Sequence, residues 1–229
     1  MAAIFEGARM RALAYSDYQA LRRDAEVIEA DFFGDKVLRL ADGNFMKWFR
    51  RKRLISSAAF FPYAKRFANN ATSLKKRGIP CPHVLATYRV SDIARDVVHY
   101  EPLPGKTLRQ LIAEADHFND PTLIRQFGRF VAELHNQGVY FRSLHLGNVV
   151  MTPEHTLGLI DIADMKTLRR PLRKSLCLRN FQHMRRYKID HAWLLQRNGD
   201  LFFESYIEHS KHIWKRQTLT EHLALAEQA

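Results

Sequence analysis

Residues 140–150 read YFRSLHLGNVV, with an Arg, a Ser, a His and an Asn set between two apolar flanks. Such a polar cluster is typical of a loop that carries chemistry, because reactive groups tend to lie on loops held by rigid elements. Ser143 is the first candidate residue. No Gly-x-Ser-x-Gly turn surrounds it, and His145 is too close in sequence to imply a catalytic triad. The stretch therefore does not favour a serine hydrolase.

The segments on either side of this stretch predict a helix before it and two strands after it. Residues 120–138 begin with Asp120 as a helix N-cap and Pro121 at the first helical position, and they end at Gly138. Residues 148–163 (NVVMTPEHTLGLIDIA) contain two short apolar runs around a Thr-Pro-Glu-His turn, which favours a strand pair.

The first hundred residues predict a small sheet of about five strands with one long helix. Strand-like runs occupy residues 26–33, 37–49, 83–90 and 96–103. The second of these runs contains Asp42-Gly43, a dipeptide that favours a tight hairpin turn. Residues 57–77 show helical spacing of apolar side chains and end in three basic residues, with Gly78 next, which together predict the end of a helix.

Two prolines and a glycine within residues 102–105 interrupt the strand pattern and mark a connection. We therefore predict an N-terminal β lobe over residues 1–101, a hinge over 102–105 and a mainly helical lobe over 106–229. Helical patterns in the second lobe occupy residues 175–196, 200–214 and 219–227. The predicted fold class is α+β.

The net charge of +12 is unevenly spread along the 229 residues. Residues 46–91 and residues 166–188 contain many Lys and Arg and not one Asp or Glu. Fields of this kind attract nucleic acid, anionic lipid headgroups or a phosphorylated substrate. Two blocks of this length favour the binding of an anionic partner over a merely solvated basic face.

The cysteine content and the apolar runs exclude several classes of protein. Cys81 and Cys177 lie far apart without Cys-x-x-Cys spacing, so neither a disulfide framework nor a structural zinc site is indicated. No window reaches the roughly 18 apolar residues that a membrane helix requires. Charged residues interrupt the N-terminus too early for a signal peptide. We expect a soluble protein of a reducing cytosol.

The order of parts resembles that of protein-kinase-like phosphotransferases: a β lobe with a mid-strand lysine, a Pro/Gly connection, a helical lobe, a catalytic loop and a hairpin that ends in Asp. FRSLHLGN at 141–148 is similar to the kinase loop H-R-D-L-x-x-x-N, and IDIA at 160–163 to the D-F-G segment. The wording over 138–165 resembles the bacterial lipopolysaccharide core heptose and Kdo kinases and their toluene-tolerance-protein relatives. The likeness extends over about 26–215.

This resemblance implies ATP and Mg²⁺ as cofactors and assigns three residues to phosphate and metal. Lys47 matches the strand lysine that pairs with the α- and β-phosphates, and Asn148 and Asp161 match the two metal-binding residues. Taken alone, Lys47 could be an ordinary exposed strand lysine and Asn148 the cap of a turn. Asp161 is harder to explain without a cation, since it ends an apolar run.

The resemblance also implies roles for residues around the nucleotide. The backbone near Glu101 and Leu103 matches the hinge that binds adenine, and Gly34 falls where the phosphates should be covered. Arg142 matches the arginine of the catalytic loop. The usual Gly-x-Gly-x-x-Gly loop is missing, and Gly34 is the one glycine of this region.

Other departures weaken the expectation of catalysis. The helix at 57–77 contains no acid to pair with the strand lysine, and Asn69 or Asn70 lies nearest that place. Phe141 replaces the His of the loop motif. Ser143 stands where the catalytic Asp should be.

Asp164 and His145 are the candidate substitute bases for the missing aspartate, and His145 can equally be a structural residue of the loop.

Two functions follow as expectations. The first is an ATP- and Mg²⁺-dependent kinase that phosphorylates a sugar hydroxyl of the lipopolysaccharide inner core, with peripheral contact to the cytoplasmic face of the inner membrane. The alternative is a pseudokinase that serves as a nucleotide-binding or regulatory module in envelope biogenesis. A nucleic-acid binder is disfavoured, because the sequence has no aromatic stacking motif and no recognition-helix signature.

Overall fold

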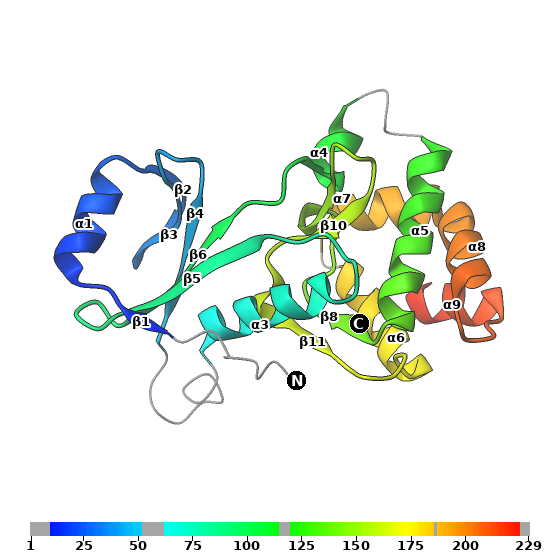
Figure 1. The fold of residues 1–229 in the computed structure, drawn as a ribbon. Coiled ribbons are helices and arrows are strands. Elements are labelled where there is room, and N and C mark those ends of the chain that lie inside the picture. The colour runs from blue at the N-terminus through cyan, green and yellow to red at the C-terminus, as the bar shows by residue number, and fades with distance from the viewer. Residues whose placement is uncertain (1–9, 52–61, 115–119, 186, 225–229) are drawn as a thin grey trace. The chain divides into compact units, whose positions relative to one another are not determined.

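The structure is a computed structural model, and it describes residues 10–51, 62–114, 120–185 and 187–224 (Figure 1). The chain divides into two compact units. Unit 1 consists of Met1–Leu103 together with Asp161–Asp164, and unit 2 consists of Pro104–Ile160 with Met165–Ala229.

A six-stranded sheet forms the body of unit 1. Its strands are β1 (Arg11–Ala12), β2 (Glu26–Asp31), β3 (Gly34–Arg39), β4 (Phe45–Arg50), β5 (His83–Val90) and β6 (Arg95–Glu101). They lie in the order β1-β5-β6-β4-β3-β2, and every neighbouring pair is antiparallel except β1 with β5. The predicted strands and the Asp42-Gly43 hairpin are confirmed, and the short β1 was not predicted.

Side chains alternate across β4, so the sheet presents a different surface to each of two helices (Figure 1). On one face Trp48 packs against Tyr18 of α1 (Tyr15–Arg23), with ring centroids 4.4 Å apart. On the other face Tyr100 of β6 packs against Phe67 of α3 (Tyr63–Lys75), at 5.1 Å. Lys47 lies between Met46 and Trp48 in the chain, and its side chain therefore points to the α3 face.

Helix α3 ends at Lys75, two residues before the predicted end. Its last turn carries Lys75, and Gly78 adopts a φ of +69°, a conformation that suits glycine at a helix end. The helix begins at Tyr63. The first residues of the predicted helix, 57–61, lie outside the described residues.

Unit 2 is mainly helical. Its helices are α4 (Leu108–Ala113), α5 (Pro121–Asn136), η2 (Leu146–Asn148), α6 (Lys174–Met184), α7 (Lys188–His191), η4 (Ala192–Arg197), α8 (Gly199–His209) and α9 (Arg216–Ala224). Its strands form two small sheets, β7 (Lys106–Thr107) with β9 (Val149–Met151) and β10 (Leu157–Leu159), and β8 (Val139–Phe141) with β11 (Met165–Thr167). The short helix η3 (Ile162–Asp164) belongs to unit 1.

Helix α5 is capped as predicted and forms the core of unit 2 with α8, beside which it lies (Figure 1). The Asp120 carboxylate accepts hydrogen bonds from the backbone of Thr122 and Leu123, and Gly138 has a φ of +74°. The predicted α+β class is confirmed. The predicted helix over 175–196 is wrong as a single element, since it breaks between α6 and α7.

The two C-terminal helices have bounds that differ from those predicted. The pattern over 200–214 ends at His209, and the pattern over 219–227 corresponds to α9, with residues 225–227 outside the described part of the chain. No helix within the described residues is long and apolar enough to cross a membrane.

A buried histidine ties α5 to the strand that precedes residues 142–148. His135 Nδ1 lies 2.9 Å from the Tyr206 hydroxyl, and Nε2 lies 3.3 Å from Asn180 Oδ1. Asn180 Nδ2 donates to the carbonyl of Phe141 at 2.7 Å, which fixes its amide so that Oδ1 faces the imidazole. The neutral ring is thus satisfied at both nitrogens, and burial lowers the pKa of His135 to about 4.

We expect the stability of the protein to fall below pH 6.5 because of His135. Its pKa is about 4 in the folded state and about 6.5 in the unfolded chain. Between these values only the unfolded state binds the proton, so the free energy of unfolding falls by about 3 kcal/mol as the pH drops from 6.5 to 4. Urea unfolding across this range measures the slope. His135→Gln should flatten it, and equal slopes for both proteins would contradict the assignment.

Candidate active site

Within unit 1, Lys47 meets Asp161. Lys47 Nζ lies 2.6 Å from Asp161 Oδ1, across more than a hundred residues of sequence. The lysine side chain is 17% exposed and the aspartate side chain 45% exposed. Because the carboxylate is half-exposed, the pair contributes little to stability. A half-open pair of this kind is accessible to an anion at the ammonium and to a cation at the carboxylate.

The backbone at Asp161 is unusual and is held by buried neighbours. Asp161 has a φ of +52°, a left-handed conformation that costs energy for a residue with a side chain. Ile162 and Ala163 directly after it are buried, and Asn70 Nδ2 of α3 donates to the Ile162 carbonyl at 2.7 Å. Packing of η3 on α3 therefore aims Asp161 at Lys47. Strain of this kind is concentrated at functional sites.

Helix α3 carries no acid in its described part, as the sequence indicates. The buried Asn70 takes the place nearest to the missing glutamate, yet it bonds the backbone of η3. The counter-charge of Lys47 is supplied by Asp161. Asn69 is exposed.

The sheet register orders three predicted nucleotide-binding positions along unit 1. Lys47 pairs with Val37 on β3 and with Val98 on β6. Gly34 lies three residues from Val37 in one direction, and Glu101 lies three residues from Val98 in the other, about 10 Å each way at the usual rise of a strand. Because the strands run antiparallel, Lys47 lies between Gly34 and Glu101.

The tip of the β2–β3 hairpin is held at the Gly34 end. Gly34 has a φ of +109°, which a residue with a side chain rarely adopts. The guanidinium of Arg50 lies 3.6 Å from the ring centroid of Phe33, and Arg95 Nη2 donates to the Phe33 carbonyl at 2.5 Å. Phe32 beside it is 95% exposed. The tip is therefore anchored through its backbone while one aromatic ring projects into solvent.

The predicted hinge residues lie at the end of β6. Glu101 is exposed and its carboxylate lies 2.9 Å from His83 Nδ1, while Leu103 is half-buried. Tyr100, directly before Glu101, was not predicted as a site residue. Burial first, and then the charge of Asp161, raises the pKa of Tyr100 well above its usual value.

Within unit 2, residues 142–148 form a loop, and a hydrogen bond within this loop fixes the orientation of the Asn148 side chain. Asn148 is buried, and its Nδ2 donates to the Ser143 carbonyl at 3.0 Å. The Asn148 carbonyl accepts from the Ile160 backbone at 3.0 Å, and Asp161 is the next residue in the chain. The bond to Ser143 leaves Asn148 Oδ1 as the oxygen available to a ligand.

The remaining predicted catalytic residues lie in two places, the 142–148 loop and the end of η3. Ser143 is half-buried and Arg142 is exposed, both directly after β8. His145 is buried, with its ring 4.7 Å from that of Tyr187 in an edge-on contact. Asp164 is half-buried at the end of η3, in unit 1. The packing of His145 favours its structural role.

A buried ion pair supports the 142–148 loop. Asp190 of α7 is 1% exposed and accepts two hydrogen bonds from Arg109 of α4, at 2.9 and 2.8 Å. Asp190 also accepts from the backbone of Leu146 at 2.9 Å. The Arg109 guanidinium packs beneath Gly147, where a Cβ would come within 2.9 Å of it, and lies over the Tyr187 ring.

The two predicted metal ligands, Asp161 in unit 1 and Asn148 in unit 2, fit Mg²⁺ by the chemistry of their donor atoms. Asp161 supplies carboxylate oxygens and Asn148 an amide oxygen, which are the hard ligands that Mg²⁺ prefers. Two protein ligands are usual for Mg²⁺, which keeps waters and binds substrate phosphates. Among the described residues no cluster of three His, Cys, Asp or Glu forms a metal site by itself.

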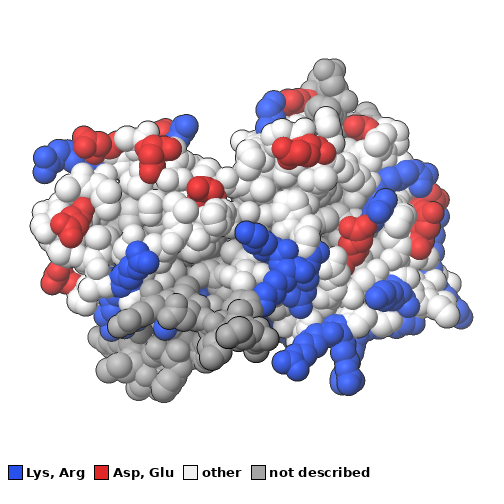
Figure 2. All heavy atoms as spheres, in the orientation of Figure 1, with Lys and Arg blue, Asp and Glu red and all other residues white. Residues whose placement is uncertain are grey.

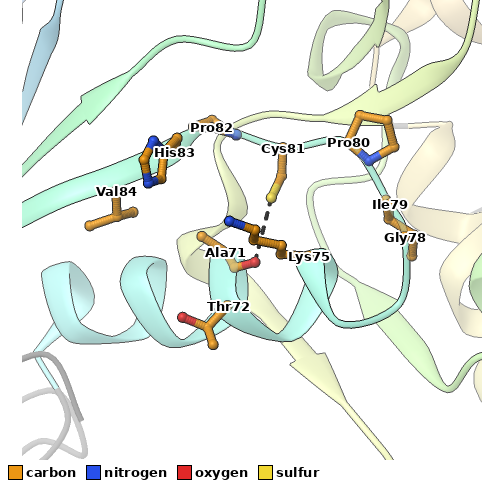
Figure 3. Close-up of a pocket in the computed structure, with 10 residues that line it drawn as sticks. All are labelled: Ala71, Thr72, Lys75, Gly78, Ile79, Pro80, Cys81, Pro82, His83 and Val84. Carbon is orange, nitrogen blue, oxygen red and sulfur yellow. Dashed lines mark hydrogen bonds between the residues drawn. The ribbon is translucent and has the colours of Figure 1, made fainter. Parts of the chain in front are cut away.

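A hollow of about 600 Å³ in unit 1 borders the predicted hinge through His83, the partner of Glu101, while Lys47 and Asp161 are not among the described residues that line it. The C-terminal half of α3 and residues 78–84 line it, and Cys81 points across it to the carbonyl of Ala71 (Figure 3). Burial raises the pKa of the Cys81 thiol to about 11, so the thiol is protonated and unreactive at neutral pH. The hollow contributes no chemistry to the candidate site.

The sequence does not predict the roles of three residues near the site: Asn70, which donates to the backbone of η3, Tyr100 and Asp190. Each interacts with a residue far away in sequence, Asn70 and Asp190 through hydrogen bonds and Tyr100 through the charge of Asp161. A weak local signal existed for Asp190, which is the one acid in the basic segment around α6 and α7.

Comparison with known proteins gives one family. A model of the phosphotransferase enzyme family (APH) matches residues 24–140, just over half of the chain. The match ends directly before Phe141 and the loop that follows it. It confirms the protein-kinase-like, two-lobed α+β fold.

Solved structures that give a match include the bifunctional kinase-methyltransferase WbdD, at 18% identity and a TM-score of 0.46, over 86% of this chain and 46% of that one. A structure of monomeric WbdD has 17% identity and a TM-score of 0.45, over 90% of this chain and 45% of that one. The chain thus spans about half the length of these solved structures. No curated protein gives a significant sequence match.

We expect Asp190→Ala to destabilise the protein, because Asp190 supports the loop at residues 142–148. The change leaves the buried Leu146 amide without its acceptor and the partly exposed Arg109 without its carboxylate, which should cost about 3 kcal/mol in the free energy of unfolding. Asp190→Asn keeps an acceptor and should cost less. Asp200→Ala removes an exposed acid of α8 and should cost no more than about 1 kcal/mol. Equal losses for Ala at 190 and at 200 in urea unfolding would contradict the role of Asp190.

Proposed function

Because the chain belongs to the phosphotransferase enzyme family, we propose that it binds ATP with Mg²⁺ and transfers the γ-phosphoryl group to a hydroxyl of its acceptor. The contact between Lys47 and Asp161, with Asp161 held at a positive φ, is the observation that carries this proposal. The pair brings together one cation for phosphate and one hard anion for metal.

In this proposal the nucleotide lies along the sheet of unit 1. Lys47 binds the α- and β-phosphates, as a charged hydrogen-bond donor on a rigid strand. The backbone near Glu101 and Leu103 binds the adenine, and the hairpin tip at Gly34 covers the phosphates. The sheet register supports this order, because Lys47 lies between the two ends.

Asp161 and Asn148 would hold the Mg²⁺, which neutralises charge on the β- and γ-phosphates. Asp161 is available for this role because among the described residues a single oxygen of its carboxylate is engaged, by Lys47. Asn148 is oriented for it by its bond to Ser143. When ATP binds, Lys47 exchanges its carboxylate partner for phosphate.

Ser143 limits the chemistry without forbidding it. Phosphoryl transfer passes through a loose transition state, in which positioning and charge neutralisation dominate. A general base typically contributes about 10²–10⁴-fold. We therefore propose a slow transferase. Arg142 lies next to the acceptor, and the Asp164 carboxylate is the base that accepts the proton of the acceptor hydroxyl.

A pseudokinase is the second candidate, and two observations favour it. Ser143 replaces the catalytic acid, and the described part of α3 carries no acid for Lys47. Such a protein serves as a nucleotide-binding or regulatory module in envelope biogenesis. Turnover separates it from the transferase, since the pseudokinase transfers no phosphate whether or not it binds nucleotide.

For the acceptor we propose a sugar hydroxyl of the lipopolysaccharide inner core, reached at the cytoplasmic face of the inner membrane. The resemblance of residues 138–165 to the core heptose and Kdo kinases supports this choice. The acid-free basic segments of the sequence are suited to an anionic glycan.

Lys47→Met and Asp161→Ala should each weaken Mg·ATP binding. Loss of one charged hydrogen bond to phosphate costs about 1.5–3 kcal/mol, or roughly 10–100-fold in affinity. Titration calorimetry with ATP, with and without Mg²⁺, measures this. Lys47→Met should lower affinity in both conditions, whereas Asp161→Ala should abolish the difference between them.

Lys75→Met, at an exposed lysine in the last turn of α3, is the matched control and should bind as the wild type does. The proposed function fails if the wild-type protein binds no nucleotide, or if all three variants bind equally.

Ser143→Asp should raise the rate of phosphate transfer from ATP to core oligosaccharide by about 10²–10⁴-fold, because it restores a base. Ser143→Asn, which has a similar shape and no basic carboxylate, is the control and should give no gain. Radiolabelled transfer to purified core oligosaccharide and to a generic protein substrate measures the rate and the acceptor. Nucleotide binding without transfer in all three proteins would identify the pseudokinase.

A further inference from the structure

Unit 2 presents a basic surface built from two segments that lie far apart in sequence. The first is the connection from β11 into α6, and the second is the connection from α8 to α9. His212 Nε2 lies 2.5 Å from the Leu172 carbonyl, and Lys174 Nζ donates to the Ile213 carbonyl at 2.7 Å. These two contacts hold the segments side by side.

The backbone of this surface is firmly anchored. Leu168 and Leu172 donate from their backbone to the carbonyls of Gly138 and His135 at the end of α5, at 2.8 and 2.9 Å. A Cβ at Gly138 would meet the Arg170 carbonyl at 2.4 Å, so the segment rests directly on that glycine. The side chains that project from it are therefore presented from a fixed base.

Six exposed cations define what we name the basic face: Arg169, Arg170, Arg173, Lys174, Lys211 and Lys215. Neither contributing segment contains an Asp or Glu. Within the described part of the chain none of the six forms an ion pair, whereas the next residue, Arg216, is paired with Asp200 and Glu204. In Figure 2 the charged side chains at the lower edge of this unit, where Figure 1 draws β11 and α6, are blue.

Exposed aliphatic side chains stand among these cations. Ile213 is 90% exposed and Leu168 is 41% exposed. Trp214, the residue after Ile213, is buried, donates to Ser210 Oγ at 3.0 Å and lies under the Lys174 ammonium at 5.2 Å. The buried tryptophan thus fixes the turn that directs Ile213 outward.

We infer that the basic face is a docking surface for an anionic lipid bilayer. Unpaired Lys and Arg are attracted to the negative potential of acidic headgroups, each contributing about a fivefold gain in partitioning. Ile213 and Leu168 can enter the boundary between headgroups and acyl chains, where apolar side chains at a basic surface gain burial. Nucleic acid would leave Ile213 without a function, since it offers phosphate and stacked bases. The inference does not depend on catalysis.

The test is co-sedimentation of the full chain with vesicles. We expect binding to an equal mixture of phosphatidylcholine and phosphatidylglycerol, no binding to phosphatidylcholine alone, and release by raised salt. The triple change Arg169→Gln, Arg170→Gln, Arg173→Gln should lower binding by on the order of 100-fold, at about fivefold for each charge. Ile213→Ser should lower it about threefold to tenfold and leave its salt dependence unchanged.

The matched control removes the same charge from unit 1. Arg11, Arg23 and Lys75 are exposed and form no ion pair among the described residues. Changed together to Gln, they should leave binding within about twofold of the wild type, because the inference assigns binding to the basic face and not to the net charge of the chain. Thermal unfolding checks that each variant is folded.

Three results would overturn the inference. The first is equal binding to vesicles with and without phosphatidylglycerol. The second is an equal loss in the control triple, which would show that net charge alone is responsible. The third is an oligonucleotide that displaces the protein from vesicles and depends on the same arginines while Ile213→Ser changes nothing, which would identify a nucleic-acid site.

Discussion

The contact between Lys47 and Asp161 is the constraint on which the candidate site depends, and it is not self-supporting. With the carboxylate half-exposed, the pair adds little to stability. The position of Asp161 comes from what surrounds it: the buried side chain of Ile162, and Asn70, which bonds the Ile162 carbonyl. Apolar burial and a neutral hydrogen bond thus position two charges, and leave both of them open to ligands.

The same reasoning changes the meaning of the missing acid on α3. A helix glutamate would hold Lys47 while Asp161 faced a metal, so that three residues shared the charges. Here Asp161 is the partner of Lys47, and Asn70 has a backbone role. In the proposed function, Mg·ATP separates the pair and supplies each member with a new partner. Loss of the helix acid therefore weakens preorganisation without leaving a buried charge unpaired.

The sequence predicts what local patterns encode. Asp42-Gly43 determines the hairpin that carries Lys47, and Asp120 and Gly138 determine the ends of α5. It does not predict long-range partners such as Asn70, whose hydrogen-bond partner Ile162 lies 92 residues away in the chain. The helix predicted over 175–196 fails for a related reason. Its apolar spacing continues, but α7 starts anew so that Asp190 reaches the Leu146 amide, and tertiary bonding overrides local propensity.

The two acid-free segments of the sequence have different fates in the fold, although their composition is alike. In the first, several cations are used within unit 1: Lys47 by Asp161, Arg50 by the ring of Phe33 and Arg89 by Asp96. In the second, arginines such as Arg169 and Arg170 project from an anchored backbone and have no ion-pair partner among the described residues. A count of charges along the sequence cannot distinguish cations with a partner in the fold from cations that face solvent, because the partners come from distant parts of the chain. The anchored arginines of the second segment keep their charge at the surface, where it can attract an anionic partner.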